Sequence, residues 1–354
     1  MANSNTGKSL TCLGGGLNRS SILIMKIKLA HNFEDIISID NLLLAWQEFI
    51  KGKRNKKDVQ IFQFNLMDNI LQLHEDLKNK TYEHGGYKEF KINDPKPRTI
   101  HKASVRDRLL HHAVYRILYP FFDKTFIADS YSCRNNKGTH KAIKRFEQFA
   151  RIVSKNNSRS CYVLKCDIKK FFASIDQKIL LEILQRHIRL PYDNQRRIIK
   201  LLEEIIHSFK PHGLPLGNLT SQLFANVYMN EFDQFAKHKL KIKYYIRYAD
   251  DFVIFSESKE YLENFISIMQ DFLQYKLKLA FHPDKVFIKT LSSGVDFLGW
   301  INFKDHRILR TKTKNRMLKR IKKNPAEETL NSFLGLLKHG NTWKNRKEIL
   351  NYAG

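Results

Sequence analysis

The sequence predicts an α+β fold in which an antiparallel sheet is backed by helices. Segments rich in β-branched and aromatic residues, such as "YYIRYADDFVIF", alternate along the chain with segments whose apolar residues recur at helical spacing. The 354 residues, 42% of them hydrophobic, can bury a sizeable core and two or three subdomains around one centre. No apolar run approaches the roughly 20 residues of a membrane span, and no internal repeat is present.

The elements follow one another in a clear order. Apolar residues at helical spacing predict two or three helices between about 35 and 81. Residues 87–103 then predict two short strands, broken at Pro95 and Pro97, with a helix directly after them. Each of these elements leads into a basic stretch of sequence.

The second half contains the most distinctive strands. "SCYVLKCDIKKFFASID", 160–176, begins as a buried strand, and its "SIDQ" has the form of a capping box that opens the next helix. A further helix follows "GLPLGNLTSQ", and "YYIRYADDFVIF" predicts two strands around a tight turn at Ala249 to Asp251. More strands and a basic helical tail from about 310 complete the chain.

The charge of the chain favours a polyanionic partner. Lys and Arg number 62 against 35 Asp and Glu, which leaves a formal charge of +27 spread along the whole sequence. Nucleic acid is the favoured partner, because counterion release drives its binding to a basic protein. An anionic membrane surface fits less well, since the basic residues do not gather on one amphipathic helix. The four cysteines show no zinc-type spacing, so we expect a cytoplasmic, reducing setting.

Three aspartates carry the strongest chemical signal. Asp167 ends one predicted strand, and Asp250 with Asp251 occupies the turn of a predicted hairpin. Antiparallel pairing of these strands would bring the three carboxylates together, where a divalent cation would relieve their mutual repulsion. Such a set can hold two Mg²⁺ ions for nucleotidyl transfer. Taken alone, Asp-Asp is also ordinary turn chemistry.

Five blocks in the expected order, with two more on the fingers side, resemble the reverse transcriptases. "YADD" at 248–251 matches the Tyr-x-Asp-Asp box of that family. The other palm and fingers blocks are "CDIKKFF", "GLPLGNLTSQLFANVYMNEFD", "LKLAFHPDKVFI", "GVDFLGW", "PKPRTIHKASVRDRLLHHAV" and "SYSCRNNKGTHKAI". The resemblance covers about residues 35–354.

The resemblance implies a right-hand polymerase with fingers, an antiparallel palm and a short helical thumb. The expected parts are a disordered extension (1–24), N-terminal helices and fingers (25–159), the palm (160–304, interleaved with fingers near 177–220) and a basic thumb (305–354). The implied activity is RNA-templated DNA synthesis from a DNA or RNA primer and dNTPs. The implied cofactor is a pair of Mg²⁺ ions, for which Mn²⁺ can substitute.

The resemblance also implies roles for individual residues. The expected metal ligands are Asp167, Asp250, Asp251 and the backbone carbonyl of Ile168. Residues expected at the nucleotide are Lys96, Arg98, Phe172, Leu216, Gly217, Gln222 and Lys285, with Phe172 as the gate against a ribose 2′-hydroxyl and Lys285 near the leaving pyrophosphate. Primer and template contacts are expected at Tyr248, Ala249, Arg134, Gly299 and Trp300. Some positions also have a plainer interpretation: Asp176 as a helix start, Asp233 as a surface residue and Phe171 as core.

Within the family, the blocks resemble bacterial enzymes of diversity-generating retroelements and, more distantly, those of group II introns. Pro215, Leu216 and Gly217 stand where intron enzymes usually carry Pro-Gln-Gly. In the diversity-generating group, loss of that Gln accompanies errors opposite template adenines. A small basic accessory protein is a further partner that this group implies.

Other functions stay open at this point. The chain could serve a group II intron, a retron or a phage-defence system, which share the same active site. A protein of another class, a non-catalytic RNA-binding or splicing-assistance protein, would have no need for three crowded carboxylates. Nucleotidyl transfer without a template, or on a DNA template, is the third alternative.

Overall fold

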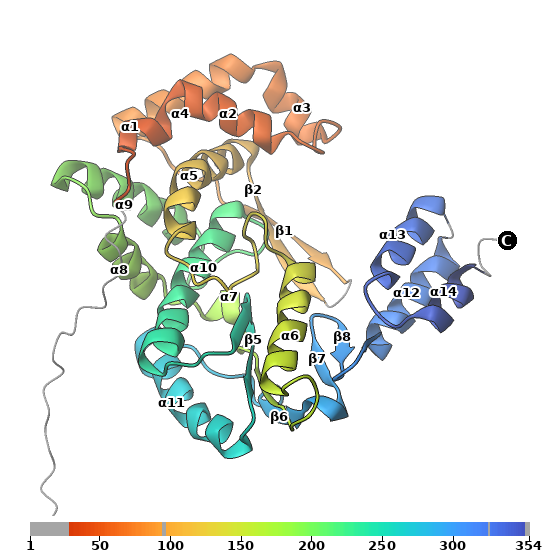
Figure 1. Cartoon of the computed structure of the whole chain (residues 1–354). Coiled ribbons are helices and arrows are strands. Elements are labelled where there is room, and N and C mark those ends of the chain that lie inside the picture. Colours follow the sequence, from red (N-terminus) through yellow and green to blue (C-terminus); the bar gives the residue numbers. More distant parts are fainter. Residues whose placement is uncertain (1–27, 94–96, 325, 351–354) are drawn as a thin grey trace, which may run out of the picture.

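The computed structural model describes residues 28–93, 97–324 and 326–350 (Figure 1). The expected extension at 1–24 and Lys96 lie outside these residues. The N-terminal elements are α1 (Phe33–Ile37), α2 (Ile39–Phe49), α3 (Lys57–Phe64), α4 (Leu66–Asn79), β1 (Tyr87–Ile92), β2 (Arg98–Ala103), α5 (Val105–Asp123) and α6 (Thr139–Val153). They confirm the predicted helices and the two strands on either side of the prolines.

The first helices pack on α5 because their apolar residues share one face. Leu42, Trp46 and Phe49 of α2 are buried, and α2 contacts α5 along its length. Ser104 caps the start of α5, where its Oγ accepts a hydrogen bond from the Asp107 N–H at 3.1 Å. β1 and β2 form an antiparallel hairpin that projects from this helical layer (Figure 1).

The central sheet has the strand order β4-β5-β3-β6, and each neighbouring pair is antiparallel. Its strands are β3 (Tyr162–Cys166), β4 (Tyr245–Tyr248), β5 (Asp251–Ser256) and β6 (Phe287–Thr290). Helices that join and cover these strands are α7 (Phe171–Ser174), α8 (Gln177–His187), α9 (Tyr192–His207), α10 (Leu219–Gln234), η1 (Phe235–Lys239) and α11 (Lys259–Leu277). The predicted hairpin and the predicted α+β class are confirmed.

Both faces of the sheet are buried, which explains why its strands are almost continuously apolar. Phe252 and Ile254 of β5 belong to the core shared with α10 and α11, whereas Val253 and Phe255 belong to a second core under α6. Side chains alternate between the faces of a strand, so each β5 residue has a fixed core to fill. The sheet is therefore clamped between two helical layers.

The C-terminal elements form a hairpin sheet followed by a helical bundle. They are η2 (Leu291–Ser293), β7 (Val295–Phe297), β8 (Trp300–Asn302), β9 (Arg307–Leu309), α12 (Thr311–Lys323), α13 (Glu327–Leu337) and α14 (Trp343–Leu350). The three-stranded sheet continues across the expected domain limit at 304. Leu298 and Gly299, both with positive φ, form the tight turn between β7 and β8. The predicted basic helical tail is confirmed.

Two local predictions were wrong. The capping box at 174–177 is absent, because Ser174 ends α7 and the carboxylate of Asp176 caps α8 by accepting from the Ile179 N–H at 3.0 Å. Gln177 instead donates to three backbone carbonyls at the end of α9 and in the loop after it, those of Ile206, Phe209 and Gly213. Asp233, expected at the surface, is fully buried. Within the described ranges, no helix has the length and apolar character to cross a membrane.

A buried histidine makes stability depend on pH. Burial lowers the pKa of His111 to about 3, and its ring stacks on His84 at a centroid distance of 5.4 Å. Between pH 3 and the usual value near 6.5, the unfolded chain binds a proton that the folded chain does not. The contribution of His111 to stability is therefore complete above about pH 6.5 and declines as the pH falls below it.

We expect the His111→Leu variant to lose less stability than the native protein when the pH is lowered from about 7 to about 5. The difference should be on the order of 1–2 kcal/mol, because the variant lacks the group that must stay neutral. Urea unfolding at both pH values measures it. His207→Leu, at a side chain that is 48% exposed, should keep the native pH dependence. An unchanged pH dependence in His111→Leu would contradict the expectation.

Candidate active site

The sheet register brings Asp167 next to the paired aspartates of the hairpin turn. Cys166 of β3 pairs with Phe252 of β5, so Asp167, one residue beyond Cys166, lies alongside Asp251. Tyr248 pairs with Asp251 and closes a two-residue turn in which Ala249 has a φ of +56°. Ala249 and Asp250 thus form the tip of the turn. The predicted convergence of the three aspartates follows from this register.

The turn carboxylates are held in an environment that disfavours negative charge. Burial, together with the charge of Asp167, raises the pKa of Asp250. Burial also raises the pKa of Asp251 to about 6, with the charges of Asp167 and Asp250 adding to the effect and Lys165 opposing it. One Asp251 oxygen, Oδ1, is buried without a hydrogen-bond partner. These are the properties of carboxylates that need a cation.

Two lysines supply positive charge to the three aspartates. The Lys285 ammonium donates to Asp167 Oδ1 at 2.8 Å, and the Lys165 Nζ lies 3.7 Å from Asp251 Oδ1. Among the residues that the structure describes, no group of three or more His, Cys, Asp or Glu side chains is arranged to hold a metal ion. The carboxylates therefore stand side by side with lysine partners and are not yet gathered around one point.

The donor set nevertheless fits a hard divalent cation. Carboxylate oxygens are the ligands that Mg²⁺ prefers, and Asp251 Oδ1, which has no hydrogen-bond partner, is one that a cation could use. Asp167, Asp250 and Asp251 are the residues that would hold such ions. Ile168, whose carbonyl was expected to contribute, is buried and forms an antiparallel bridge with Phe281.

Strand β2 of the β1-β2 hairpin is hydrogen-bonded to the loop before α10. The His101 N–H donates to the Leu216 carbonyl at 2.9 Å, and the Asn218 Nδ2 donates to the His101 carbonyl at 3.2 Å. Gly217 has a φ of +112°, and a Cβ there would lie 2.8 Å from Cγ2 of Ile100. Burial and the charge of Asp167 raise the pKa of Asp250, and the charge of Arg98, exposed at the start of β2, opposes part of this rise. Hydrogen bonds thus join strand β2, which begins at Arg98, to the loop that contains Leu216 and Gly217.

The two phenylalanines after Asp167 have different environments. Phe171 is buried in the core, as expected, whereas Phe172 is half-buried and meets the Phe171 ring edge-on at 5.4 Å. The Phe172 carbonyl accepts from the Leu214 N–H at 2.8 Å, which fixes the backbone next to the "GLPLG" loop. Gln222 is half-buried in the first turn of α10. Phe172 and Gln222 are thus both partly exposed to solvent.

Two of the expected primer and template contacts are occupied within the protein. Only 6% of the Arg134 side chain is exposed, and its guanidinium bonds Asp123 and the carbonyls of its own loop. Trp300 is 2% exposed and packs in the core of the C-terminal bundle. Both side chains therefore stabilise the fold, in place of the direct contacts that we expected. Their signal in the sequence, a basic or aromatic residue in a matching block, does not distinguish the two roles.

The remaining expected contacts lie in turns beside the site. The Tyr248 hydroxyl accepts from Thr139 Oγ1 at 3.1 Å, and the tyrosine is half-buried against the second core. Gly299 accepts from the Arg310 N–H at 3.1 Å, which ties the β7-β8 turn to the start of α12. The Ala249 carbonyl accepts a hydrogen bond from Arg247 Nη1 at 3.0 Å, a contact that the sequence did not predict.

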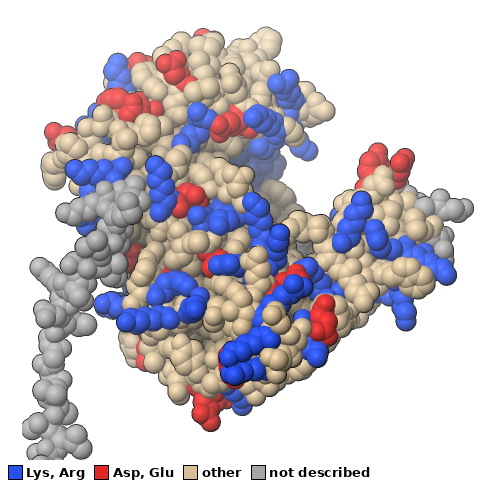
Figure 2. Space-filling view, viewed as in Figure 1, with Lys and Arg blue, Asp and Glu red and all other residues tan. Residues whose placement is uncertain are grey.

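Lysine and arginine cover much of the surface around these elements. Figure 2 shows them spread over the fingers, the palm and the C-terminal bundle, with an open hollow between the N-terminal half and the bundle. In α12, apolar Met317 and Ile321 face the bundle core, and the exposed positions include Lys312, Arg316, Lys319 and Lys323. A positive surface of this kind binds a nucleic acid backbone through its phosphates.

Two residues near the aspartates were missed because they lie inside apolar strands. Lys165 is 8% exposed within β3, and Arg247 is fully buried within β4. A charged residue in a strand buried on both faces requires a partner, and this is the signal that could have identified both.

This arrangement is that of a right-hand polymerase, with three aspartates at one end of an antiparallel palm sheet. The chain belongs to the reverse transcriptase family. The model of this family, described as reverse transcriptase (RNA-dependent DNA polymerase), matches residues 90–302, more than half of the chain.

Similar proteins agree with this assignment. Protein YkfC of Escherichia coli K12 is 24% identical, over 67% of this chain and 69% of its own length. The group II intron-encoded protein LtrA of Lactococcus lactis subsp. cremoris is 24% identical over 76% of this chain, which spans only 54% of LtrA. A Candida tropicalis telomerase, solved with the TWJ fragment of telomeric RNA, has a TM-score of 0.50 and 14% identity, covering 79% of this chain and 56% of its own. That likeness concerns the fold alone.

We expect Gly217→Ala to raise the KM for dNTPs about tenfold, which corresponds to about 1.4 kcal/mol. The added Cβ would meet Ile100 at 2.8 Å and push β2 away from the loop before α10. Steady-state primer extension measures the effect. Gly52→Ala is the matched control, since Gly52 also has a positive φ but has no neighbour within 4 Å of a Cβ. Equal KM values for the two variants would contradict this role of the contact.

Proposed function

We propose that this chain is an RNA-directed DNA polymerase that makes cDNA by two-metal nucleotidyl transfer, and that it is the error-prone enzyme of a diversity-generating retroelement. The observation that supports the polymerase most directly is the β3-β5 register, which puts Asp167 beside Asp250 and Asp251. The proposed substrates are a primed RNA template and dNTPs. The proposed partners include a small basic accessory protein.

The residues of the site divide the work of the reaction. Asp167, Asp250 and Asp251 would hold the metal ions, which would supply Lewis-acid activation of the primer hydroxyl and neutralise charge on the departing phosphates. Arg98 of the fingers and Lys285, whose ammonium contacts Asp167, supply positive charge near Asp250 that would attract the triphosphate. The primer 3′-hydroxyl attacks the α-phosphate, and pyrophosphate leaves.

Phe172 and the basic surface have further roles in the proposed reaction. Phe172, half-buried beside the Leu214 backbone, is in a position to exclude a ribose 2′-hydroxyl by its bulk. The basic surface holds the RNA and DNA hybrid through its phosphates and reads its shape more than its sequence.

Leu216 supports the narrower assignment to a diversity-generating retroelement. The hydrogen bond from His101 holds its backbone next to the fingers, so its side chain has a defined place in the loop. An aliphatic chain there cannot hydrogen-bond the nascent base pair as an amide could, and geometric checking of the pair is weakened. An intron-type enzyme is the second candidate, favoured by the similarity to LtrA. A variable-protein gene and its template repeat next to this gene would distinguish the two.

We expect Asp250→Asn to reduce dNTP incorporation on a primed RNA template by at least about 10³-fold, because the amide removes a negatively charged metal ligand. Radiolabelled dNTP incorporation with Mg²⁺ measures it. Asp271→Asn, an exposed position in α11, is the control and should retain native activity. Substantial activity in Asp250→Asn would disprove the metal assignment. A native protein that copies DNA but not RNA templates would disprove the template assignment.

We expect the native enzyme to concentrate its errors opposite template adenines, and Leu216→Gln to lower their frequency about tenfold. The amide of the introduced glutamine can hydrogen-bond near the nascent base pair. A tenfold lower error frequency corresponds to about 1.4 kcal/mol of added discrimination between correct and incorrect pairs. Sequencing of cDNA products measures the error spectrum. Leu216→Met keeps an apolar side chain of similar volume and should keep the native error spectrum. A native spectrum without adenine bias would count against the diversity-generating assignment.

A further inference from the structure

A fully buried ion pair lies directly beneath the turn that carries Asp250 and Asp251. Arg247 of β4 and Asp233 of α10 both have a side-chain exposure of 0%. The Arg247 Nε lies 2.8 Å from Asp233 Oδ1, and Nη2 lies 2.7 Å from Asp233 Oδ2, which is a two-point contact. The Tyr245 hydroxyl adds a third hydrogen bond to Asp233 Oδ1 at 2.7 Å. Both charges are thus compensated away from water.

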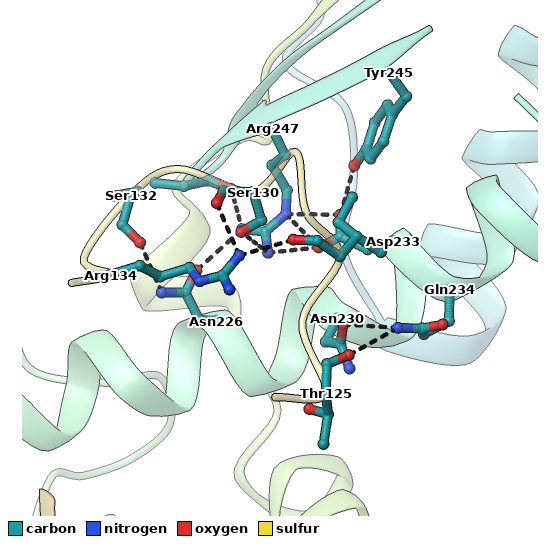
Figure 3. A network of polar contacts seen from close by, with 12 residues as sticks. Thr125, Ser130, Ser132, Arg134, Asn226, Asn230, Asp233, Gln234, Tyr245 and Arg247 are labelled. Atoms are coloured by element: carbon teal, nitrogen blue, oxygen red, sulfur yellow. Dashed lines mark hydrogen bonds and ion pairs between the residues drawn. The ribbon is translucent and has the colours of Figure 1, made fainter. Parts of the chain in front are cut away.

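The guanidinium does more than neutralise Asp233. Figure 3 shows Arg247 between Asp233 on one side and Asn226 and Ser130 on the other. Its Nη2 also donates to Ser130 Oγ at 3.1 Å, and its Nη1 donates to Asn226 Oδ1 at 3.2 Å. The last donor of Nη1 reaches the Ala249 carbonyl at 3.0 Å. All five N–H donors of the side chain therefore have acceptors.

These acceptors belong to separate parts of the molecule. Asn226 and Asp233 lie in α10, and Ser130 lies in the segment between α5 and α6. The backbone of that segment also pairs with Arg247, through the Asp129 carbonyl and the Tyr131 N–H, each at 3.0 Å. Asn226 in turn donates to the Ser132 carbonyl at 2.9 Å. Arg247 is the point where α10, the 130–132 segment and the aspartate turn meet.

The contact with Ala249 is the one that bears on the reaction. Ala249 has a positive φ, which is unfavourable for a residue with a Cβ and needs surrounding contacts to persist. Its carbonyl is fixed by Arg247, and Asp250 is the next residue in the chain. The orientation of the peptide that leads into Asp250 thus depends on the guanidinium.

We propose that Arg247, anchored by Asp233, is a positioning residue for the polymerase reaction: it sets the aspartate turn through the Ala249 carbonyl and keeps that turn in register with α10 and the 130–132 segment. The inference rests on the proposed role of Asp250 and Asp251 as metal ligands. A lysine could balance the charge of Asp233, but its single ammonium has three donors on one atom and cannot span acceptors on four residues. Charge compensation and positioning therefore make different predictions for Arg247→Lys.

The experiment is single-turnover extension of a primed RNA template with Mg²⁺, with the affinity for the primed template measured separately by fluorescence anisotropy. The amplitude reports the fraction of correctly folded enzyme, and the rate constant reports the reaction in that fraction. For Arg247→Lys we expect the rate constant to fall tenfold or more, while the amplitude and the Kd for the primed template stay within twofold of native. A second variant, Arg247→Met with Asp233→Leu, replaces the ion pair by apolar residues, which buried pairs often tolerate without loss of stability. It should fold and be equally slow.

Arg116→Lys is the matched control. Arg116 also bonds an Asn side chain and a carboxylate, those of Asn41 and Glu48, but it lies between α5 and α2, away from the turn. Its rate constant should equal that of the native enzyme. A decrease of less than tenfold in both Arg247 variants, or a loss of amplitude or template affinity with an unchanged rate constant, would overturn the proposal. Activity that survives Asp250→Asn would refute the metal-ligand assignment instead, so the two failures are distinguishable.

Discussion

Antiparallel pairing of β3 with β5 is the constraint on which the site depends. The aspartates come from distant parts of the sequence, and only the register that pairs Cys166 with Phe252 puts Asp167 beside Asp251. A slip of one residue would turn every β5 side chain to the opposite face. Because both faces are packed, with Phe252 in one core and Phe255 in the other, such a slip would expose apolar surface and bury mismatched side chains. Core packing therefore determines the geometry of the carboxylates.

The same packing explains why the charged side chains near the site lie next to side chains of opposite charge. The carboxylates are surrounded by apolar strands and helices, and the charges that oppose them come from the neighbouring residues Lys165, Lys285 and Arg98. Beneath them, Arg247 and Asp233 compensate one another without solvent. Because burial makes an unpaired charge so unfavourable, each charged side chain in this region has a specific position.

The sequence was informative wherever a local pattern determines a local structure. The hairpin around Ala249, the helix that follows the strands at 87–103 and the strand that leads to Asp167 follow from periodicity and turn chemistry, and the structure confirms them. The pairing partners of buried polar residues could not be predicted, because they depend on contacts distant in sequence. Asp233 was assigned to the surface since its own helix gives no sign of Arg247, and Arg134 was assigned to nucleic acid since its partner Asp123 lies in a different element. The prediction of a capping box was wrong for a related reason. Gln177 donates to three backbone carbonyls that are distant in sequence, so the residues around it do not indicate these partners.

The ion pair between Lys285 and Asp167 has a consequence for the order of events at the site. The ammonium occupies Asp167 Oδ1, so a cation that takes this oxygen as a ligand would compete with Lys285 for it. Under the proposed function, a cation that binds Asp167 displaces Lys285, and a triphosphate that attracts Lys285 uncovers Asp167 for a cation. Metal and nucleotide would then each strengthen the binding of the other by the same factor, as thermodynamic linkage requires. Lys285 would act as an internal counterion that compensates the charge of Asp167 in the empty site and is displaced when metal and nucleotide bind.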